Sequence, residues 1–378
     1  MNRFTPVRQQ IRAAQVRFGR VPESVRGYHV GYHRRLELRL PALLLPPGGD
    51  PDIDGRLETF GAYKAAARLD ADMLYFDLCE LGGEDGGWRP ELGPVAVRMV
   101  ADGIRDITFT DKILAVRLPP LRSMLFDDAV VHVIDKVGEL VDAFILTDIE
   151  AADEVREISN VVRNAQRVAG RKNPIALEVE IGTPRSVLAM EAIAAIDDVS
   201  ALVFDPMGLT RCLGCPLEDN TWIWDWHAVR GQVPVIAAAH GKEAVDAAPL
   251  SVAPRDGDDA DLAAALEVVR GEADAAVRHG FAAKRVIDPL HVPVVSAAFT
   301  PMREEALDSL GRAVGYARSA ASQIAGGRDF VNAYAALRQV RVALLARVLS
   351  DDDIARTGFA LPELQRRVRA KAQGERTL

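Results

Sequence analysis

The sequence contains little cysteine, few aromatic side chains and no long hydrophobic run. Three cysteines in 378 residues are too few for a disulfide framework, which is typical of a reducing compartment. The sequence has no uninterrupted apolar stretch of the roughly 20 residues that a membrane-spanning helix needs. Residues 1–20 also lack the apolar core of a secretory signal. We therefore expect a cytoplasmic protein with no membrane partner.

A surplus of positive charge is missing as well. The formal net charge is −8 at pH 7, whereas binding to a nucleic-acid backbone requires a clustered basic surface. We therefore expect no nucleic-acid partner. The exception is the segment 1–40, which contains nine arginines and two glutamates. We interpret it as a basic N-terminal extension, either a solvated helix or an arm that contacts an acidic neighbour.

Short apolar runs alternate with longer segments of helical periodicity. Eight such runs follow one another along the chain, at 42–45, 73–78, 113–116, 143–146, 175–179, 201–204, 233–237 and 285–287. This alternation predicts an α/β fold with a parallel sheet, and the number eight favours a closed (β/α)₈ TIM barrel over residues 41–300. An open doubly wound sheet is the alternative, although its G-x-G-x-x-G fingerprint is absent after the first run. Residues 301–378 are predicted to be helical and to pack on the barrel or on a neighbouring subunit.

Polar residues that directly follow the apolar runs are the candidates for a site, because barrel enzymes use the carboxyl ends of their strands. In the segment 176–182, ALEVEIG, side chains alternate, so Glu178 and Glu180 both point toward the barrel axis. Asp205 follows the sixth run and Arg117 follows the third. Glu180 and Asp205 in one mouth favour a divalent cation, Mg²⁺ or Mn²⁺, with Arg117 gripping a substrate carboxylate. The alternative is that these acids pair with arginines or cap helices.

Several further residues occupy similar positions after a run. His240 follows the run 233–237 and is a candidate for proton transfer, as is Glu80 after the second run. We expect three more acids to contact the substrate, namely Asp77, Asp148 and Asp288.

Other motifs have a plain structural interpretation beside a functional one. The glycine-rich segment 81–88 is either a lid or a surface loop, and the tryptophan-rich segment 221–227 forms core, a subunit contact or a wall of the substrate pocket. Cys212 and Cys215 have the spacing of half a zinc site, or of a redox pair, and His29 and His33 have helical i, i+4 spacing. We favour ordinary packing for the cysteines and, for the histidines, a segment that wraps the N-terminal face of the barrel.

Several segments resemble, in order, those of the HpcH/HpaI aldolase and citrate lyase β-subunit-like family. The resemblance runs over about residues 41–349, and its segments are LPPGGD ending at Asp50, DADMLYFDLCE, ILAVRLPPL, VDAFILTDIEAADEVREI, LEVEIGTPRSVLAMEAIAA and GFAAKRVIDPLHVPVVSAAFTP. The resemblance implies a TIM barrel and a Mg²⁺-dependent lyase or aldolase acting through an enolate. Its substrate would be a carboxylated hydroxyacid or keto acid, often CoA-linked, and the assembly a homo-oligomer, trimeric or hexameric. It also implies that Arg117 binds the substrate carboxylate and that Glu180 is a metal ligand.

The sequence departs from the family pattern at positions around the predicted mouth. Gly208 stands where the family has a metal-binding aspartate, and Asp205 lies three residues earlier. Asp148 replaces a lysine, Asp288 replaces a histidine, and Cys79 replaces an acid. These changes leave a second hypothesis open, a catalytically degenerate barrel that acts as a binding or scaffold subunit.

Overall fold

The computed structural model describes residues 34–46, 48–79, 90–110, 112–171, 174–215, 226–249, 259–319 and 327–372. These residues form two compact units, of which the first ends at Ser296 and the second begins at Ala297. The first unit contains the sheet, and the second is helical.

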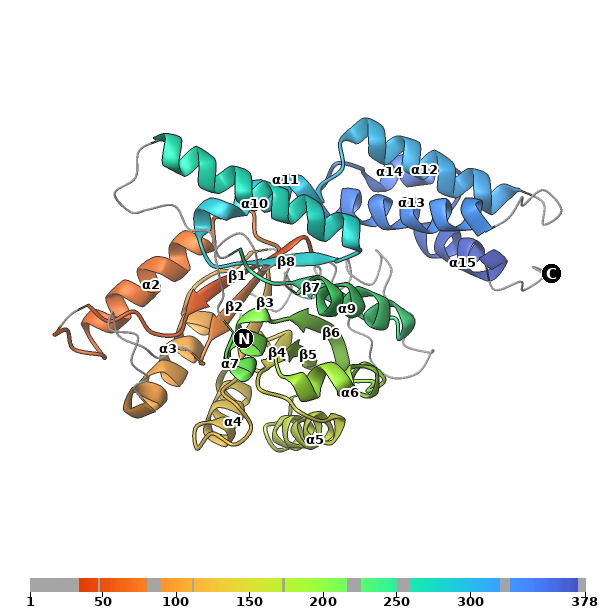
Figure 1. Ribbon diagram of the computed structural model, residues 1–378. Coiled ribbons are helices and arrows are strands. Elements are labelled where there is room, and N and C mark those ends of the chain that lie inside the picture. Colours follow the sequence, from red (N-terminus) through yellow and green to blue (C-terminus); the bar gives the residue numbers. More distant parts are fainter. Residues whose placement is uncertain are drawn as a thin grey trace. The chain divides into compact units, whose positions relative to one another are not determined.

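Eight parallel strands of the first unit close into a barrel in chain order (Figure 1). The strands are β1 (Leu36–Pro41), β2 (Met73–Asp77), β3 (Ile113–Arg117), β4 (Ala143–Leu146), β5 (Ala176–Ile181), β6 (Val199–Phe204), β7 (Glu243–Asp246) and β8 (Ala283–Val286). The predicted (β/α)₈ barrel is therefore confirmed.

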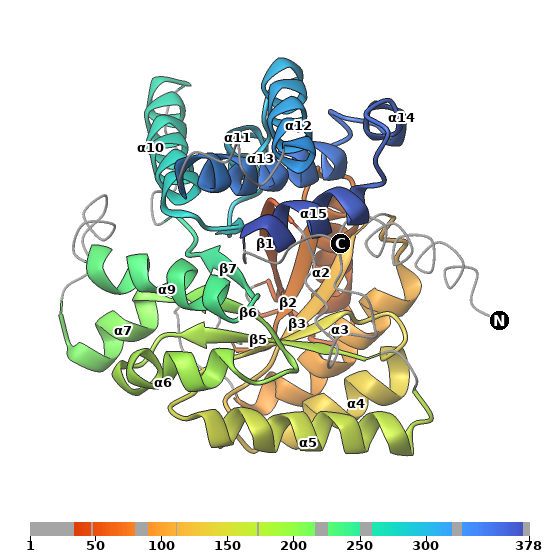
Figure 2. The same cartoon turned by 90° about the vertical axis from the view of Figure 1, so that its right-hand side faces the viewer.

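Helices connect successive strands and surround the barrel (Figures 1 and 2). They are α2 (Asp54–Ala66), the short η1 (Pro90–Leu92), α3 (Gly93–Asp106), α4 (Phe126–Val137), α5 (Ala152–Val168), α6 (Pro184–Ala194), α7 (Pro206–Leu213), α9 (His227–Ala239), α10 (Asp259–His279), the short η2 (Pro289–His291) and α11 (Val292–Phe299), which runs across the boundary between the units.

The strands present alternate residues to the two sides of the barrel wall. In β1, Leu36, Leu38 and Leu40 are buried on the side that faces the helices, while Glu37 makes ion pairs with arginines inside the barrel. Other strands contribute an interior apolar cluster of Met73, Tyr75, Ile113, Ala115, Ala143, Ile145 and Ala176. The barrel interior thus combines an apolar layer with charged side chains.

Two of the eight predicted strand positions are wrong. The first strand is β1 rather than 42–45, because Glu37 and Arg39 interrupt its apolar residues by pointing inward. The run 233–237 lies inside α9, whose buried face includes Arg230, Val233, Pro234 and Ala237, a helical spacing. The seventh strand is β7, which begins and ends with an acidic residue and does not read as an apolar run.

The second unit consists of helices α12 (Arg303–Arg318), α13 (Gly327–Leu345), α14 (Asp351–Ala355) and α15 (Leu361–Ala372). Its core includes Leu310, Leu337, Val340 and Leu364, which are buried. The helical prediction for the C-terminal part of the chain is therefore confirmed. How this unit packs on the barrel or on another subunit stays a prediction.

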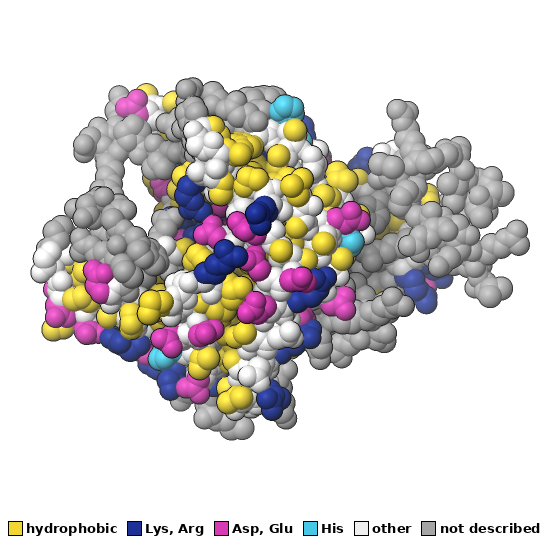
Figure 3. Space-filling model, turned by 60° about the horizontal axis from the view of Figure 1, so that its bottom comes forward, with side chains coloured by type: hydrophobic (Ala, Val, Ile, Leu, Met, Phe, Trp, Pro, Cys, Tyr) yellow, Lys and Arg dark blue, Asp and Glu magenta, His cyan; other side chains and the backbone are white. Residues whose placement is uncertain are grey.

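The surface of the described chain is mixed in charge. On the face in Figure 3, basic and acidic side chains are interspersed among apolar ones. Within the described ranges, no helix combines the length and the apolarity needed to cross a bilayer.

Candidate functional site

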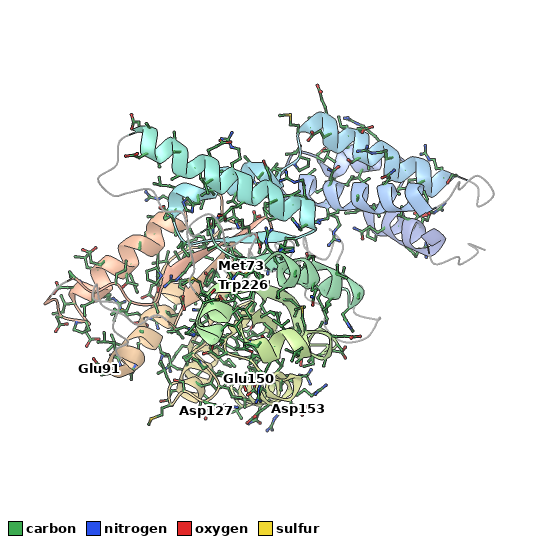
Figure 4. All side chains as sticks on the ribbon, viewed as in Figure 1. Met73, Glu91, Asp127, Glu150, Asp153 and Trp226 are labelled. Carbon is green, nitrogen blue, oxygen red and sulfur yellow. The ribbon has the colours of Figure 1, made fainter. Side chains whose placement is uncertain are left out.

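The candidate site lies at the carboxyl ends of the barrel strands. Asp77 and Arg117 are the last residues of β2 and β3 and are paired neighbours in the sheet. Glu180 lies near the end of β5, and Asp205 directly follows β6. Asp127 and Asp153, labelled in Figure 4, lie in the first turns of α4 and α5, the helices that follow β3 and β4. Four strands therefore bring one basic and three acidic side chains to one mouth.

Arg117 holds Glu180 through two parallel hydrogen bonds. Its Nε donates to Oε1 of Glu180 at 2.8 Å and its Nη2 donates to Oε2 at 2.9 Å. Its Nη1 also donates to Oδ1 of Asp77 at 3.1 Å. The Arg117 side chain is 17% exposed and that of Glu180 only 2%, so Arg117 is the member of this pair that solvent reaches. A guanidinium that binds one carboxylate through two parallel hydrogen bonds also has the right shape to bind the carboxylate of a substrate.

A second arginine, which lies far from Arg117 in the sequence, contacts the same glutamate. Nη1 of Arg285, in β8, donates to Oε1 of Glu180, and its Nε donates to Oε2 of Glu37 at 3.0 Å. Burial alone would raise the pKa of Glu180, but Arg117 and Arg285 outweigh burial and lower it to about 2. Glu180 is therefore an anion with two cationic partners.

The ion pairs continue into the barrel from Glu37. Arg34 contacts Glu37 and also donates to Oε1 of Glu178 at 2.7 Å. Burial, together with the neighbouring charge of Glu37, raises the pKa of Glu178 to about 8 despite Arg34. At the mouth, Arg39 lies 2.8 Å from Oδ2 of Asp77. Both glutamates of β5 thus face the interior, as the alternation predicted.

Asp205 begins α7 and occupies a space that two glycines leave open. Its Oδ1 accepts the backbone N–H of Gly208 at 3.1 Å, which caps the helix. A Cβ atom added to Gly182 or to Gly208 would lie 2.5 Å from Oδ2 of Asp205. Burial and the negative charge of Glu180 raise the pKa of Asp205. The charge of Glu180 therefore acts on the carboxylate of Asp205.

These carboxylates are the oxygen donors available for a metal at the mouth. No cluster of three or more His, Cys, Asp or Glu side chains suited to a metal occurs in the described ranges. Mg²⁺ commonly takes one or two carboxylates and completes its shell with water and substrate oxygens, so a two-carboxylate donor set fits it. Coordination by Glu180 would bring a divalent cation close to the guanidinium of Arg117, which donates to both carboxylate oxygens.

The remaining predicted residues lie in different places. Asp148 has a positive φ of 52° and pairs with Arg211 at 2.8 Å, so an arginine partly neutralises its charge. Asp288 is half-buried and caps η2 by accepting the N–H of Leu290. Glu80 lies outside the described residues.

His240 does not lie at the mouth. It ends α9, before β7, and helices precede their following strand at the amino end of the barrel. The prediction that it follows the seventh strand is wrong because the run before it is helical. We assign it no part in the site.

The sequence interpretation missed Arg285, Glu37 and Arg34. The signal was available in the segment 34–41, RRLELRLP, where leucines alternate with charged residues as in a strand with a charged inner face. Cys79 was noticed only as a departure from the family pattern. Its Sγ donates to the carbonyl of Leu118 at 2.9 Å, and burial raises the pKa of its thiol, so it packs beside Arg117 as a neutral group.

The other motifs provide no further part of this site. Cys212 and Cys215 are free thiols whose sulfurs lie near two different carbonyl groups, of Gly182 and Thr210. The segment 81–88, residues 221–225, His29 and His33 lie outside the described residues. Trp226 precedes the first residue of α9.

Known proteins resemble this chain in fold and in sequence. A citrate lyase from Burkholderia xenovorans LB400 superposes with a TM-score of 0.63 at 15% identity, covering 90% of this chain and 99% of that one. The protein CitE of Mycobacterium tuberculosis, in complex with magnesium, acetoacetate and coenzyme A, has a TM-score of 0.53 at 21% identity and covers 81% and 97%. An L-malyl-CoA/beta-methylmalyl-CoA lyase of Rhodobacter capsulatus is 24% identical over 274 residues, 68% of this chain and 78% of that protein. Residues 62–289 match the family described as HpcH/HpaI aldolase/citrate lyase. Because that match spans more than half of the sequence, this chain belongs to the HpcH/HpaI aldolase/citrate lyase family.

Proposed function

We propose that the protein is a Mg²⁺-dependent carbon–carbon lyase that cleaves a carboxylated hydroxyacid, or its CoA thioester, to a keto acid and an enolate. The observation that carries the proposal is the two-point grip of Arg117 on a carboxylate at the carboxyl end of the barrel. A substrate carboxylate has the same shape and charge as that of Glu180, and the arginine is partly exposed. The guanidinium that binds Glu180 is therefore suited to bind the carboxylate of the substrate.

The relatives support this reaction class. One is named a lyase for L-malyl-CoA and beta-methylmalyl-CoA, and another was crystallised with magnesium, acetoacetate and coenzyme A. By analogy with these relatives, we propose that this chain uses a divalent cation and acts on a free or CoA-linked acid. The negative charge of Asp148, which by itself would disfavour a polyanion such as CoA, is partly balanced by Arg211.

Glu180 and Asp205 are the residues that would hold the cation. When bound, Mg²⁺ would polarise the oxygens of the keto-acid half and stabilise developing negative charge. Gly182 and Gly208 leave room for the carboxylate of Asp205. Burial and the charge of Glu180 raise the pKa of Asp205, and a bound cation would favour its ionised form.

The chain's other residues orient the substrate. Asp77 contacts Arg117 from β2 and is itself held by Arg39, so Arg117 keeps one carboxylate partner when it turns from Glu180 to the substrate. The buried thiol of Cys79 packs beside this arginine and adds no charge. We assign Arg117 to substrate binding and Asp77 to positioning of Arg117.

A second function, a barrel without turnover that binds an acid as a subunit of a larger assembly, is favoured by one observation. Glu180 has two arginine partners, and Gly208 stands where the family has an acidic ligand. Such a protein would bind a keto acid through Arg117 without needing a cation.

Release of a keto acid tests the proposal. The purified chain is incubated with Mg²⁺ and L-malyl-CoA, malate or citrate, and the keto acid is trapped with phenylhydrazine. We expect release from at least one substrate, loss of release with a chelator, and at least a 100-fold lower rate in Glu180→Gln. Binding of a keto acid without release, and independent of Mg²⁺, would favour the second function.

A further inference from the structure

The guanidinium of Arg285 is a second positive charge at the candidate metal site, and it lies deeper in the barrel than that of Arg117. Its guanidinium lies between the carboxylates of Glu180 and Glu37, and its Cζ atom is 4.9 Å from the centre of the Tyr75 ring. The side chain is 8% exposed. These contacts place the positive charge inside the barrel, where water screens it poorly.

The two arginines on Glu180 have different contacts. Arg117 binds both carboxylate oxygens, whereas Arg285 binds only Oε1. If Arg117 turns toward a carboxylate ligand, Oε2 of Glu180 becomes available while Oε1 stays with Arg285. Arg117 is therefore the exchangeable partner, and Arg285 is the fixed one.

We infer, on the basis of the proposed function, that Arg285 is a built-in counter-cation that weakens divalent-ion binding at Glu180 until an anionic substrate binds. A fixed positive charge in contact with a metal-ligating carboxylate repels a divalent ion. A substrate carboxylate adds negative charge and draws Arg117 away from Oε2. Metal and keto acid then bind cooperatively, each raising the affinity of the other by the same factor. Arg285 acts through Glu180, so it is a positioning residue.

Manganese binding measured by electron paramagnetic resonance tests this inference without any turnover. Free Mn²⁺ is titrated with the wild-type chain and with Arg285→Met, in the presence and absence of pyruvate. Arg285→Lys is the matched control because it keeps the charge. The single variant Arg285→Met leaves the buried Glu37 with one arginine fewer, which could prevent folding. The double variant E37Q/R285M removes the negative charge of Glu37 as well and so provides a second test.

The expected results have a definite direction. Wild type and Arg285→Lys bind Mn²⁺ at least tenfold more tightly with pyruvate than without. Arg285→Met and the double variant bind Mn²⁺ alone at least tenfold more tightly than wild type, and pyruvate improves their affinity less. Equal or weaker Mn²⁺ binding by both variants relative to wild type would overturn the inference and leave the proposed function standing.

A failure of the proposed function gives a different pattern. If neither wild type nor the two Arg285 variants bind Mn²⁺ with or without pyruvate, the chain has no metal site and both ideas fail. Glu180→Gln locates the ion, since unchanged Mn²⁺ affinity in that variant places it elsewhere and also overturns both. Binding of Mn²⁺ by the Arg285→Met chain but not by wild type, even with pyruvate, would overturn the inferred cooperativity and favour the second function.

Discussion

The fork of Arg117 and the carboxylate of Glu180 meet across the barrel mouth in two parallel hydrogen bonds of 2.8 and 2.9 Å. Glu180 comes from β5 and Arg117 from β3, so the pair spans β4, which ends at Leu146. The contact therefore fixes both side chains without ligand, and its removal has consequences for stability as well as for binding.

Replacing Glu180 with glutamine should make the protein less stable in a pH-dependent way. The folded pKa of Glu180 is about 2, below its ordinary value of 4.5, so its contribution is full above pH 4.5 and is lost as the pH falls toward 2. We expect Glu180→Gln to lower the free energy of unfolding at pH 7 by about 3 kcal/mol, because it leaves two buried arginines without their anion. Urea denaturation between pH 3 and pH 7 measures this. The difference between wild type and variant should shrink toward pH 3, and a constant difference would contradict the assignment.

Replacing Glu178 with glutamine should have the opposite pH dependence. Burial raises the folded pKa of Glu178 to about 8, so its contribution is present below pH 4.5 and is lost as the pH rises through 8. Glutamine resembles the neutral acid at every pH. We therefore expect Glu178→Gln to equal wild type near pH 5 and to be the more stable protein near pH 9, as measured by urea denaturation. Lower stability of the variant at pH 9 would show that Glu178 is needed as an anion beside Arg34.

Asp205→Asn should distinguish the contribution of the helix cap to stability from the effect of the negative charge of Asp205. Asparagine caps α7 as aspartate does, but it does not repel Glu180. Without metal we expect the Tm of Asp205→Asn to equal or exceed that of wild type, whereas Asp205→Ala loses the cap at about 1 kcal/mol. Millimolar Mn²⁺ with pyruvate should raise the Tm of wild type and leave both variants unchanged. A full metal-induced shift in Asp205→Asn would remove Asp205 from the site.

Gly208 should not tolerate the aspartate that the family has at this position. A Cβ there would lie 2.5 Å from Oδ2 of Asp205 and 2.6 Å from the carbonyl oxygen of Gly182. We expect Gly208→Ala to lower the free energy of unfolding by roughly 1–3 kcal/mol, and Gly208→Asp to lower it further without improving metal binding.

Gly231 provides the matched control for Gly208. It lies inside α9, and no heavy atom of the described residues is within 4 Å of a Cβ added there. Gly231→Ala should therefore stabilise the protein by about 0.5–1 kcal/mol. Equal thermal stability of Gly208→Ala and Gly231→Ala would show that Asp205 moves aside without cost.

The fold was predictable from the sequence because most strands contain a short apolar run. Six of the predicted runs overlap observed strands, namely β2 to β6 and β8, since a strand covered by helices and facing a packed interior has few polar residues. The first and seventh strands were misplaced because their inner or terminal residues are charged. A search for apolar runs misses β1 because it contains Glu37 and Arg39, and misses β7 because it contains Glu243 and Asp246.

The residues at the mouth were predictable, but their pairing and the deeper arginines were not. Strand alternation predicted that Glu180 faces the interior, and the apolar runs placed Arg117 after the third strand and Asp205 after the sixth. It did not predict that Arg285 reaches Glu180 from β8, because contacts across a barrel join residues more than 100 positions apart. It also gave no information on the close approach of Asp205 to Gly208, which depends on the start of α7.

The chain of alternating charges inside the barrel also constrains how this protein diverges. Arg34, Glu37, Arg285, Glu180, Arg117, Asp77 and Arg39 form consecutive contacts from the start of β1 to the mouth. Neutralising any one member leaves its neighbour as an unmatched buried ion, at a cost of about 3–5 kcal/mol. Coupled replacements avoid that cost, so we expect a new specificity at the mouth to be accompanied by an exchange several residues deeper in the barrel.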